Sequence, residues 1–224
     1  LWFNDEDEGG KNQHEEDFMT DQLARLRKPV KFSYTKVTNF EAGKAMVDNI
    51  SNMFQNKFNI IVYNFVDMLS HARTDMQVIR ELADDESAYR SLTVSWFEHS
   101  PLLEAIRKIV SRNVKVVIST DHGTIRVKEP SKLVGDRNTN TNLRYKQGKN
   151  LNYEKKDVFE VKNPAEAMLP RTNLSTAFVF AKQDKFFAYP NNYNHYVNFY
   201  RNTFQHGGIS PEEMIIPVIS LTNR

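Results

Sequence analysis

The chain has 224 residues, of which 40% are apolar, a net charge of +2 and no cysteine. This length fits one large domain or part of a larger one, and the small net charge gives no general attraction to nucleic acid or membranes. The absence of cysteine excludes disulfides, thiolate metal sites and cysteine nucleophiles. No apolar run approaches the roughly 18 residues of a membrane-spanning helix, and the N-terminus carries no signal peptide, so we expect a cytoplasmic protein without membrane insertion.

The N-terminal part predicts a helix, a strand and a second helix. We expect the first helix over residues 15–27 and the strand over 30–37. Thr38 has Glu41 three residues on, which is capping-box spacing, so a helix is expected to open at Thr38 and to run to about residue 54.

Two apolar strands and the helices between them predict an α/β sheet. The run over 58–66 is nearly continuously apolar and β-branched, which is typical of a strand buried on both faces. Helical patterns fill 74–112, with a restart at Ser100-Pro101, and a second buried strand covers 114–118. The order strand, helices, strand indicates a βαβ crossover.

Residues 124–153 are basic and polar and are predicted to form an insertion or lid near a strand end. Seven Lys or Arg residues stand against two acids between Arg126 and Lys149. The segment contains strand-like pieces at 124–128 and 141–146. A solvated basic loop is the competing interpretation.

The last third predicts a hairpin, an aromatic helix, a capped turn and a final strand. The pattern places the hairpin at 177–179 and 186–189 and the helix at 193–204. In the segment 207–213, a serine, a proline and two acids indicate a helix start after a glycine turn. The final strand is expected over 215–221.

Five side chains of metal-ligand type follow strands or precede a glycine turn: Asp67, His71, Asp121, His122 and His206. Carboxylate oxygens and imidazole nitrogens are ligands of catalytic zinc or manganese. Asp67 and His71 share a helix face if a helix follows the strand. Asp121 and His122 follow a strand at the edge where ligands bind in α/β sheets, and Gly123 permits the bend that would let both reach one ion.

Each of these residues also has a purely structural interpretation. Asp67 and His71 could share an exposed helix face, Asp121 could cap a turn, and His206 could pack beneath the glycine turn. The remaining histidines are interpreted as surface or structural residues: His14, His99 and His195.

The ordered motifs resemble the PglZ domain of the alkaline phosphatase superfamily. They are Asp67-Met-Leu-Ser-His71, Ser119-Thr-Asp-His-Gly123 and the segment from His206 to Pro217. The sequences of segments 120–128 and 142–146 resemble the effector domain of PorX-type response regulators, which act in type IX secretion control. The resemblance implies an α/β fold with a central sheet flanked by helices, of which residues 1–224 are the C-terminal portion.

The resemblance also implies a site for two zinc ions, with manganese as the alternative. One ion would be held by Asp67, His71 and His206, and the other by Asp121 and His122. The family completes the second site with a further Asp and a Thr or Ser nucleophile, which this chain does not show. We expect that nucleophile segment, and a receiver domain that couples to a histidine kinase, upstream of residue 1.

The function implied is that of a phosphodiesterase or phosphatase effector domain that hydrolyses oligonucleotide-type phosphodiesters. Four cations of the basic segment would bind substrate phosphates: Arg126, Lys128, Arg144 and Lys146. The alternative is a non-catalytic module for dimerisation or partner binding, with a structural metal. A sulfatase or phosphomutase relative would share the metal ligands but not the sequence of segments 120–128 and 142–146.

Overall fold

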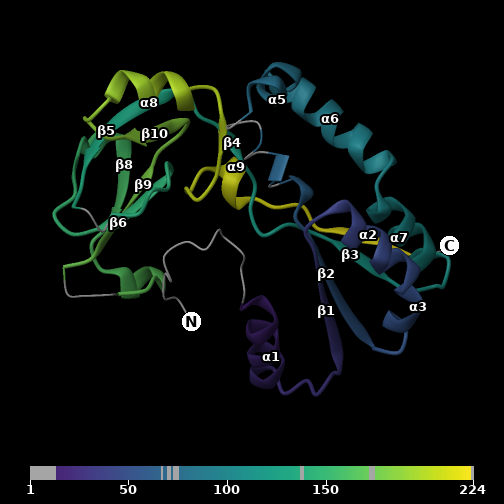
Figure 1. Cartoon of the computed structure of the whole chain (residues 1–224). Helices are drawn as coiled ribbons and strands as arrows, with labels where there is room; N and C mark the ends of the chain where they lie inside the picture. Colours follow the sequence, from purple (N-terminus) through teal and green to yellow (C-terminus); the bar gives the residue numbers. More distant parts are fainter. Residues whose placement is uncertain are drawn as a thin grey trace. The chain divides into compact units, whose positions relative to one another are not determined.

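The computed structural model describes residues 14–66, 68–69, 72, 76–136, 139–171 and 175–222. The chain forms two compact units (Figure 1). The first unit contains Leu1–Asp67, Arg90–Val116 and Thr222–Arg224, and the second contains Met68–Tyr89 and Val117–Leu221. Helices and strands are mixed, so the predicted α/β class is confirmed. The described strands form five small sheets, and the predicted central sheet is not confirmed.

The first unit is built on a parallel pair of strands joined through two helices. Its elements are α1 (Glu15–Arg25), β1 (Phe32–Val37), α2 (Phe40–Asp48), α3 (Ile50–Met53), β2 (Phe58–Tyr63) and α7 (Pro101–Val110). Strands β1 and β2 pair in parallel, so β1, α2, α3 and β2 form a crossover unit. Among the described strands, those over 58–66 and 114–118 fall in different sheets, so the crossover predicted between them is not confirmed.

The core of the first unit lies where α2, α3 and α7 pack beside this strand pair. Its fully buried side chains are Val37, Met46, Val47, Ile50 and Ala105. Aliphatic side chains spaced along α2 face inward, as the amphipathic pattern of a surface helix requires.

Capping residues set where the helices of this unit begin. The Oδ1 atom of Asn39 accepts a hydrogen bond from the Ala42 N–H at 2.8 Å, so Asn39 is the N-cap of α2 and the prediction of Thr38 is wrong by one residue. Ser100 caps α7 through the Leu103 N–H at 3.4 Å, with Pro101 at the first helical position, as predicted.

Two further helices lie in the stretch of chain around the boundary at Tyr89 and Arg90. Helix α5 (Gln77–Leu82) lies in the second unit, and α6 (Glu86–Glu98) begins in the second unit and ends in the first. In the described ranges, no helix has both the length and the apolar character that crossing a membrane requires.

The second unit is rich in short strands. These are β3 (Val116–Ile118), which starts at the unit boundary, β4 (Ile125–Arg126), β5 (Glu129–Val134), β6 (Tyr145–Gly148), β7 (Asn152–Tyr153), β8 (Val158–Val161), β9 (Ala177–Ala181), β10 (Lys185–Ala188), β11 (Phe204–Gln205) and β12 (Ile219–Leu221). The 3-10 turns η1 (Lys155–Asp157) and η2 (Pro164–Ala167) and the helices α8 (Tyr193–Tyr200) and α9 (Pro211–Met214) complete it.

The strands pair as β10-β5-β7, β6-β9-β8, β11-β4 and β12-β3. The basic segment 124–153 thus supplies β4 to β7. Strands β4, β5 and β6 pair with strands from later in the chain, and β7 pairs with β5. Strands β9 and β10 follow one another through a tight turn but belong to different sheets. The predicted hairpin is therefore wrong: the pattern located both strands, while the ladder partners come from elsewhere in the sequence.

Two apolar clusters hold this unit together. One lies under α8, which runs along β10 (Figure 1), and contains Ile125, Val127, Phe186, Ala188 and Val197. The other lies between the two three-stranded sheets and contains Leu133, Val158, Val179, Ala181 and Phe187.

Candidate metal centre

A short antiparallel ladder brings two distant predicted ligands together. Strand β4 begins just after His122, and β11 ends directly before His206. Phe204 lies opposite Arg126, and the ladder continues where the Val127 N–H donates to the Thr203 carbonyl at 3.0 Å. Because the two strands run in opposite directions, the residues before β4 and after β11 emerge at the same end.

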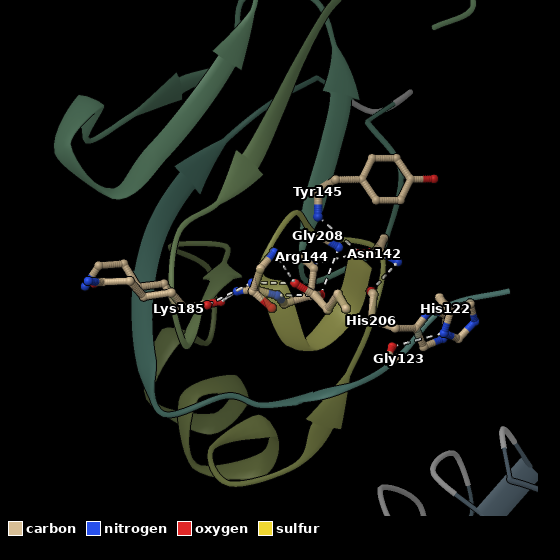
Figure 2. Close-up of polar contacts among 11 residues, drawn as sticks. His122, Gly123, Asn142, Arg144, Tyr145, Lys185, His206 and Gly208 are labelled. Atoms are coloured by element: carbon tan, nitrogen blue, oxygen red, sulfur yellow. Dashed lines mark hydrogen bonds and ion pairs between the residues drawn. The ribbon is translucent and has the colours of Figure 1, made fainter. Parts of the chain in front are cut away.

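The imidazole rings of His122 and His206 stack against each other at that end of the ladder (Figure 2). Their centroids are 4.0 Å apart, and their planes differ by 10°. The Nδ1 atom of His122 lies 3.1 Å from the Gly123 carbonyl oxygen. A proton on Nδ1 that donates to this carbonyl leaves the Nε2 lone pair available to a ligand.

Asp121 has one oxygen in its own turn and the other facing His122. Oδ1 accepts a hydrogen bond from the His122 backbone N–H at 3.1 Å, while Oδ2 lies 3.9 Å from Nε2 of His122. Two zinc ligands at the corners of a tetrahedron with bonds of about 2 Å are about 3.3 Å apart. The pair is thus slightly wider than a coordination edge, and both interpretations of Asp121, turn cap and ligand, fit its two oxygens.

Gly123 is needed for close packing with α9. Its N–H donates to the Glu213 carbonyl at 2.8 Å, and a Cβ atom at this position would lie 2.0 Å from the Glu212 carbonyl oxygen. We predicted that glycine serves a backbone bend. The structure adds a separate reason, which is that no side chain fits between this turn and α9.

The turn after His206 is held by a buried ion pair. The guanidinium of Arg144 and the carboxylate of Glu213 are 0% and 1% exposed and bond in bidentate fashion, with Nε–Oε1 and Nη2–Oε2 distances of 2.9 and 2.8 Å. Glu213 also accepts the backbone N–H groups of Gly208 and Ser210 at 2.9 and 3.1 Å. The capped turn predicted over 207–213 is confirmed, with Glu213 as its centre.

The protonation of Glu213 follows from these partners. Burial by itself raises the pKa of a carboxyl group. For Glu213, the hydrogen bonds and charge of Arg144, together with the N–H groups of Gly208 and Ser210, outweigh that effect and hold the pKa below its ordinary value. Glu213 is therefore an anion that matches the cation of Arg144.

Two of the four predicted substrate-binding cations lie inside the fold. Arg144 donates to the carbonyls of Gln183, at 2.8 Å, and Lys185, in addition to Glu213. Lys146 is 1% exposed; its Nζ donates to the Asn140 carbonyl at 2.7 Å and lies 4.8 Å from the Tyr189 ring centroid. Burial lowers the pKa of Lys146 to about 8.

The other two cations are more open. The Lys128 side chain is 58% exposed, with Nζ 3.9 Å from an Asp184 oxygen. Arg126 lies in β4 opposite Phe204, and its buried Nε has no hydrogen-bond partner among the described residues. Contact of any of these four cations with a phosphate stays a prediction.

The structure thus joins part of the predicted ligand set. His122 and His206 lie side by side, with Asp121 next to His122 in the chain, whereas Asp67 and His71 lie outside the described residues. Within the described ranges, no group of three or more His, Cys, Asp or Glu side chains is placed to hold one ion. The nitrogen and oxygen donors that are present have the chemical character that zinc prefers.

Sequence reasoning missed two residues that organise the site. Glu213 was seen only as an acid in a helix start, and Asn142 only as part of a segment that resembles a known family. The capping-box spacing from Ser210 to Glu213 was a usable signal for Glu213. Nothing local distinguishes Asn142 from other loop asparagines.

A family comparison matches nearly the whole chain. The model described as the BREX system PglZ alkaline phosphatase-like domain matches residues 1–221. No curated protein gives a significant match.

Proposed function

Since the chain belongs to the PglZ family of alkaline phosphatase-like domains, we propose that it acts as a metal-dependent phosphoric ester hydrolase. We further propose oligonucleotide-type phosphodiesters as substrates and zinc as the metal, with manganese as the alternative. The proposed setting is the effector part of a PorX-type response regulator in the cytoplasm, controlled through a receiver domain by a histidine kinase.

The stacked pair of His122 and His206 is the observation that carries this proposal. Two rings 4.0 Å apart and nearly parallel can each present a nitrogen to its own ion. The separation of the rings matches the spacing of about 3.5–4 Å between metals in two-metal hydrolases. His206 would act with Asp67 and His71, and His122 with Asp121.

The proposed metal ions, their ligands and the nucleophile each have a distinct task. Bound divalent ions would lower the pKa of the attacking hydroxyl and neutralise the leaving oxygen. Asp121 and His122 supply oxygen and nitrogen donors from a turn whose shape is fixed by the hydrogen bond to Oδ1. The proposed nucleophile is a Thr or Ser that comes before Asp67 in chain order.

The basic segment would hold the anionic substrate. Arg126, in the strand next to the histidines, is the best placed of the four proposed cations because its Nε atom lacks a partner in the described part of the chain. Lys128 would contact a further phosphate. Arg144 and Lys146 would act only if their internal hydrogen bonds opened.

A partner-binding module is the second candidate function. Apolar side chains near the C-terminus are exposed: Met214 by 63%, Ile215 by 76% and Val218 by 70%. Exposed apolar groups close together in a chain can mark a protein-binding surface. In this case the metal would be structural, and the output would be a homodimer or another complex.

The full-length protein, with any residues that precede Leu1, provides the test. We expect two zinc ions per chain by elemental analysis and hydrolysis of bis(p-nitrophenyl) phosphate and of short oligonucleotides. His122→Ala and His206→Ala should each lower kcat/KM at least 100-fold because each removes a metal ligand.

His195→Ala is the matched control, since His195 is an exposed histidine on α8 whose ring lies against Tyr196 and Phe199. It should leave the rate unchanged. A protein that binds metal but hydrolyses neither monoesters nor diesters would favour the partner-binding module instead.

A further inference from the structure

The side chain of Asn142 links the buried ion pair to the histidine turn. Its Oδ1 accepts the backbone N–H groups of Arg144 at 2.7 Å and Tyr145 at 3.1 Å. Its Nδ2 donates to the His206 carbonyl at 3.3 Å. Figure 2 shows Asn142 between Arg144 and His206, with dashed lines to both sides.

The orientation of this amide is determined by its neighbours. Two backbone N–H groups point at one end of the amide, and only an oxygen can accept them. The other end must then be the NH₂ group, which faces the His206 carbonyl. An amide is the one short side chain that accepts at one end and donates at the other.

The other side of Asn142 is fixed by Gly207. This glycine has φ +100°, and a Cβ atom there would lie 2.9 Å from Nδ2 and 3.2 Å from Oδ1 of Asn142. The side chain thus packs directly on the turn that follows His206. Its Oδ1 is held by the backbone N–H of Arg144, whose guanidinium is buried against Glu213.

We propose that Asn142 is a positioning residue that sets the backbone of His206, and so holds the His206 ring against His122. The inference rests on the proposed function for its meaning, because the value of the ring position is metal binding. Residues that orient metal ligands through hydrogen bonds, without touching the metal, typically contribute about 10–100-fold to metal affinity.

Asn142→Asp is the decisive variant because it separates the two halves of the amide. A carboxylate still accepts from Arg144 and Tyr145 but cannot donate to the His206 carbonyl. The added negative charge would by itself favour a cation. A loss of zinc affinity in this variant therefore cannot come from the charge.

Asn140→Asp is the matched control. Asn140 lies in the same loop, its Oδ1 accepts the Gln147 N–H at 2.9 Å, and its Nδ2 has no partner among the described residues. The substitution adds the same charge and keeps the acceptor, but it removes no donated hydrogen bond.

Two measurements on the full-length protein test the proposal. In the metal-free protein, NMR of the imidazole carbon-bound protons reports the stacking, because each ring shifts the resonances of the other. We expect Asn142→Asp to move these resonances toward unstacked values and to weaken zinc binding, measured by chelator competition, by about 10–100-fold. Asn140→Asp should change neither.

The outcomes distinguish this inference from the proposed function. Unchanged ring resonances and unchanged zinc affinity in Asn142→Asp overturn the positioning role. A wild-type protein that binds no zinc contradicts the proposed function, and the ring resonances still decide the role of Asn142. If Asn142→Asp moves the imidazole resonances no more than Asn140→Asp does, the added charge explains the change and the inference is wrong. Melting temperatures of both variants near that of the wild type show that the fold is intact.

Discussion

At the scale of single residues, the site depends on groups that are fully removed from water. Arg144 and Glu213 are both almost completely buried, and each satisfies the other in a bidentate pair. Taking two charges out of water is costly, so such a pair need not add net stability. Its value lies in what it fixes, since Glu213 also holds the backbone of Gly208 and Ser210.

Replacing Glu213 with Gln should destabilise the second unit by about 3–5 kcal/mol, because the Arg144 cation would stay buried without a counter-charge. Urea unfolding measures the loss. Glu212→Gln, at the exposed neighbour on the same helix turn, should change the free energy of unfolding by less than about 0.5 kcal/mol. Equal effects of both substitutions would show that Arg144 finds another partner.

The same pair predicts the response to acid. The folded-state pKa of Glu213 lies below the ordinary value of 4.5. Its contribution is therefore complete above about pH 4.5 and is lost as the pH falls through the folded-state pKa. The Glu213→Gln variant should lose less stability than the wild type over that acid range.

At the scale of elements, local sequence signals located most helices and strands but not their partners. The capping-box spacing of Thr38 and Glu41 predicted the start of α2 within one residue. The observed cap is the next residue, Asn39, and Thr and Asn are both favoured at the N-cap position. Only the observed hydrogen bond to the Ala42 N–H decides between them.

A pair of substitutions tests this assignment. Asn39→Ala should cost about 1 kcal/mol of unfolding free energy because it leaves a first-turn N–H group of α2 without its cap. Thr38→Ala, one residue earlier, should cost clearly less. Thermal unfolding of the two variants side by side is sufficient, and a larger loss for Thr38→Ala would return the cap to the residue that the spacing predicted.

At the scale of the whole molecule, burial of Lys146 predicts how stability changes in alkali. The folded-state pKa is about 8, against an ordinary value of 10.5. Between these values the unfolded chain binds more protons than the folded chain, so the free energy of unfolding should rise with pH by up to about 1.4 kcal/mol per unit.

Lys146→Met should remove this rise and stabilise the protein near pH 7, because the buried cation is no longer desolvated. Urea unfolding between pH 7 and 9.5 measures both effects. Lys149→Met, at an exposed lysine of the same segment, should keep the wild-type slope. If Lys146→Met also keeps it, another group is responsible.

The sequence predicted the α/β class, and two of its candidate ligands, His122 and His206, lie side by side; metal binding by them stays a prediction. The resemblance assigns His122 and His206 to different ions, and nothing in the local sequence shows that their rings stack. The short ladder that joins them was outside the reach of periodicity, since β4 and β11 are two residues each. Burial of Arg144 and Lys146 was likewise invisible, because charged residues in a basic segment normally face water.

The ladder between β4 and β11 has a further consequence for how such domains can diversify. The chain leaves His122 through one strand and returns to His206 through its partner, so the intervening residues form a closed excursion with both ends tied at one place. Relatives, or a protein engineer, could exchange most of that excursion as a block and alter substrate choice without separating the histidines. The exchange would have to preserve the short stretch around Asn142 and Arg144, which is the excursion's second attachment.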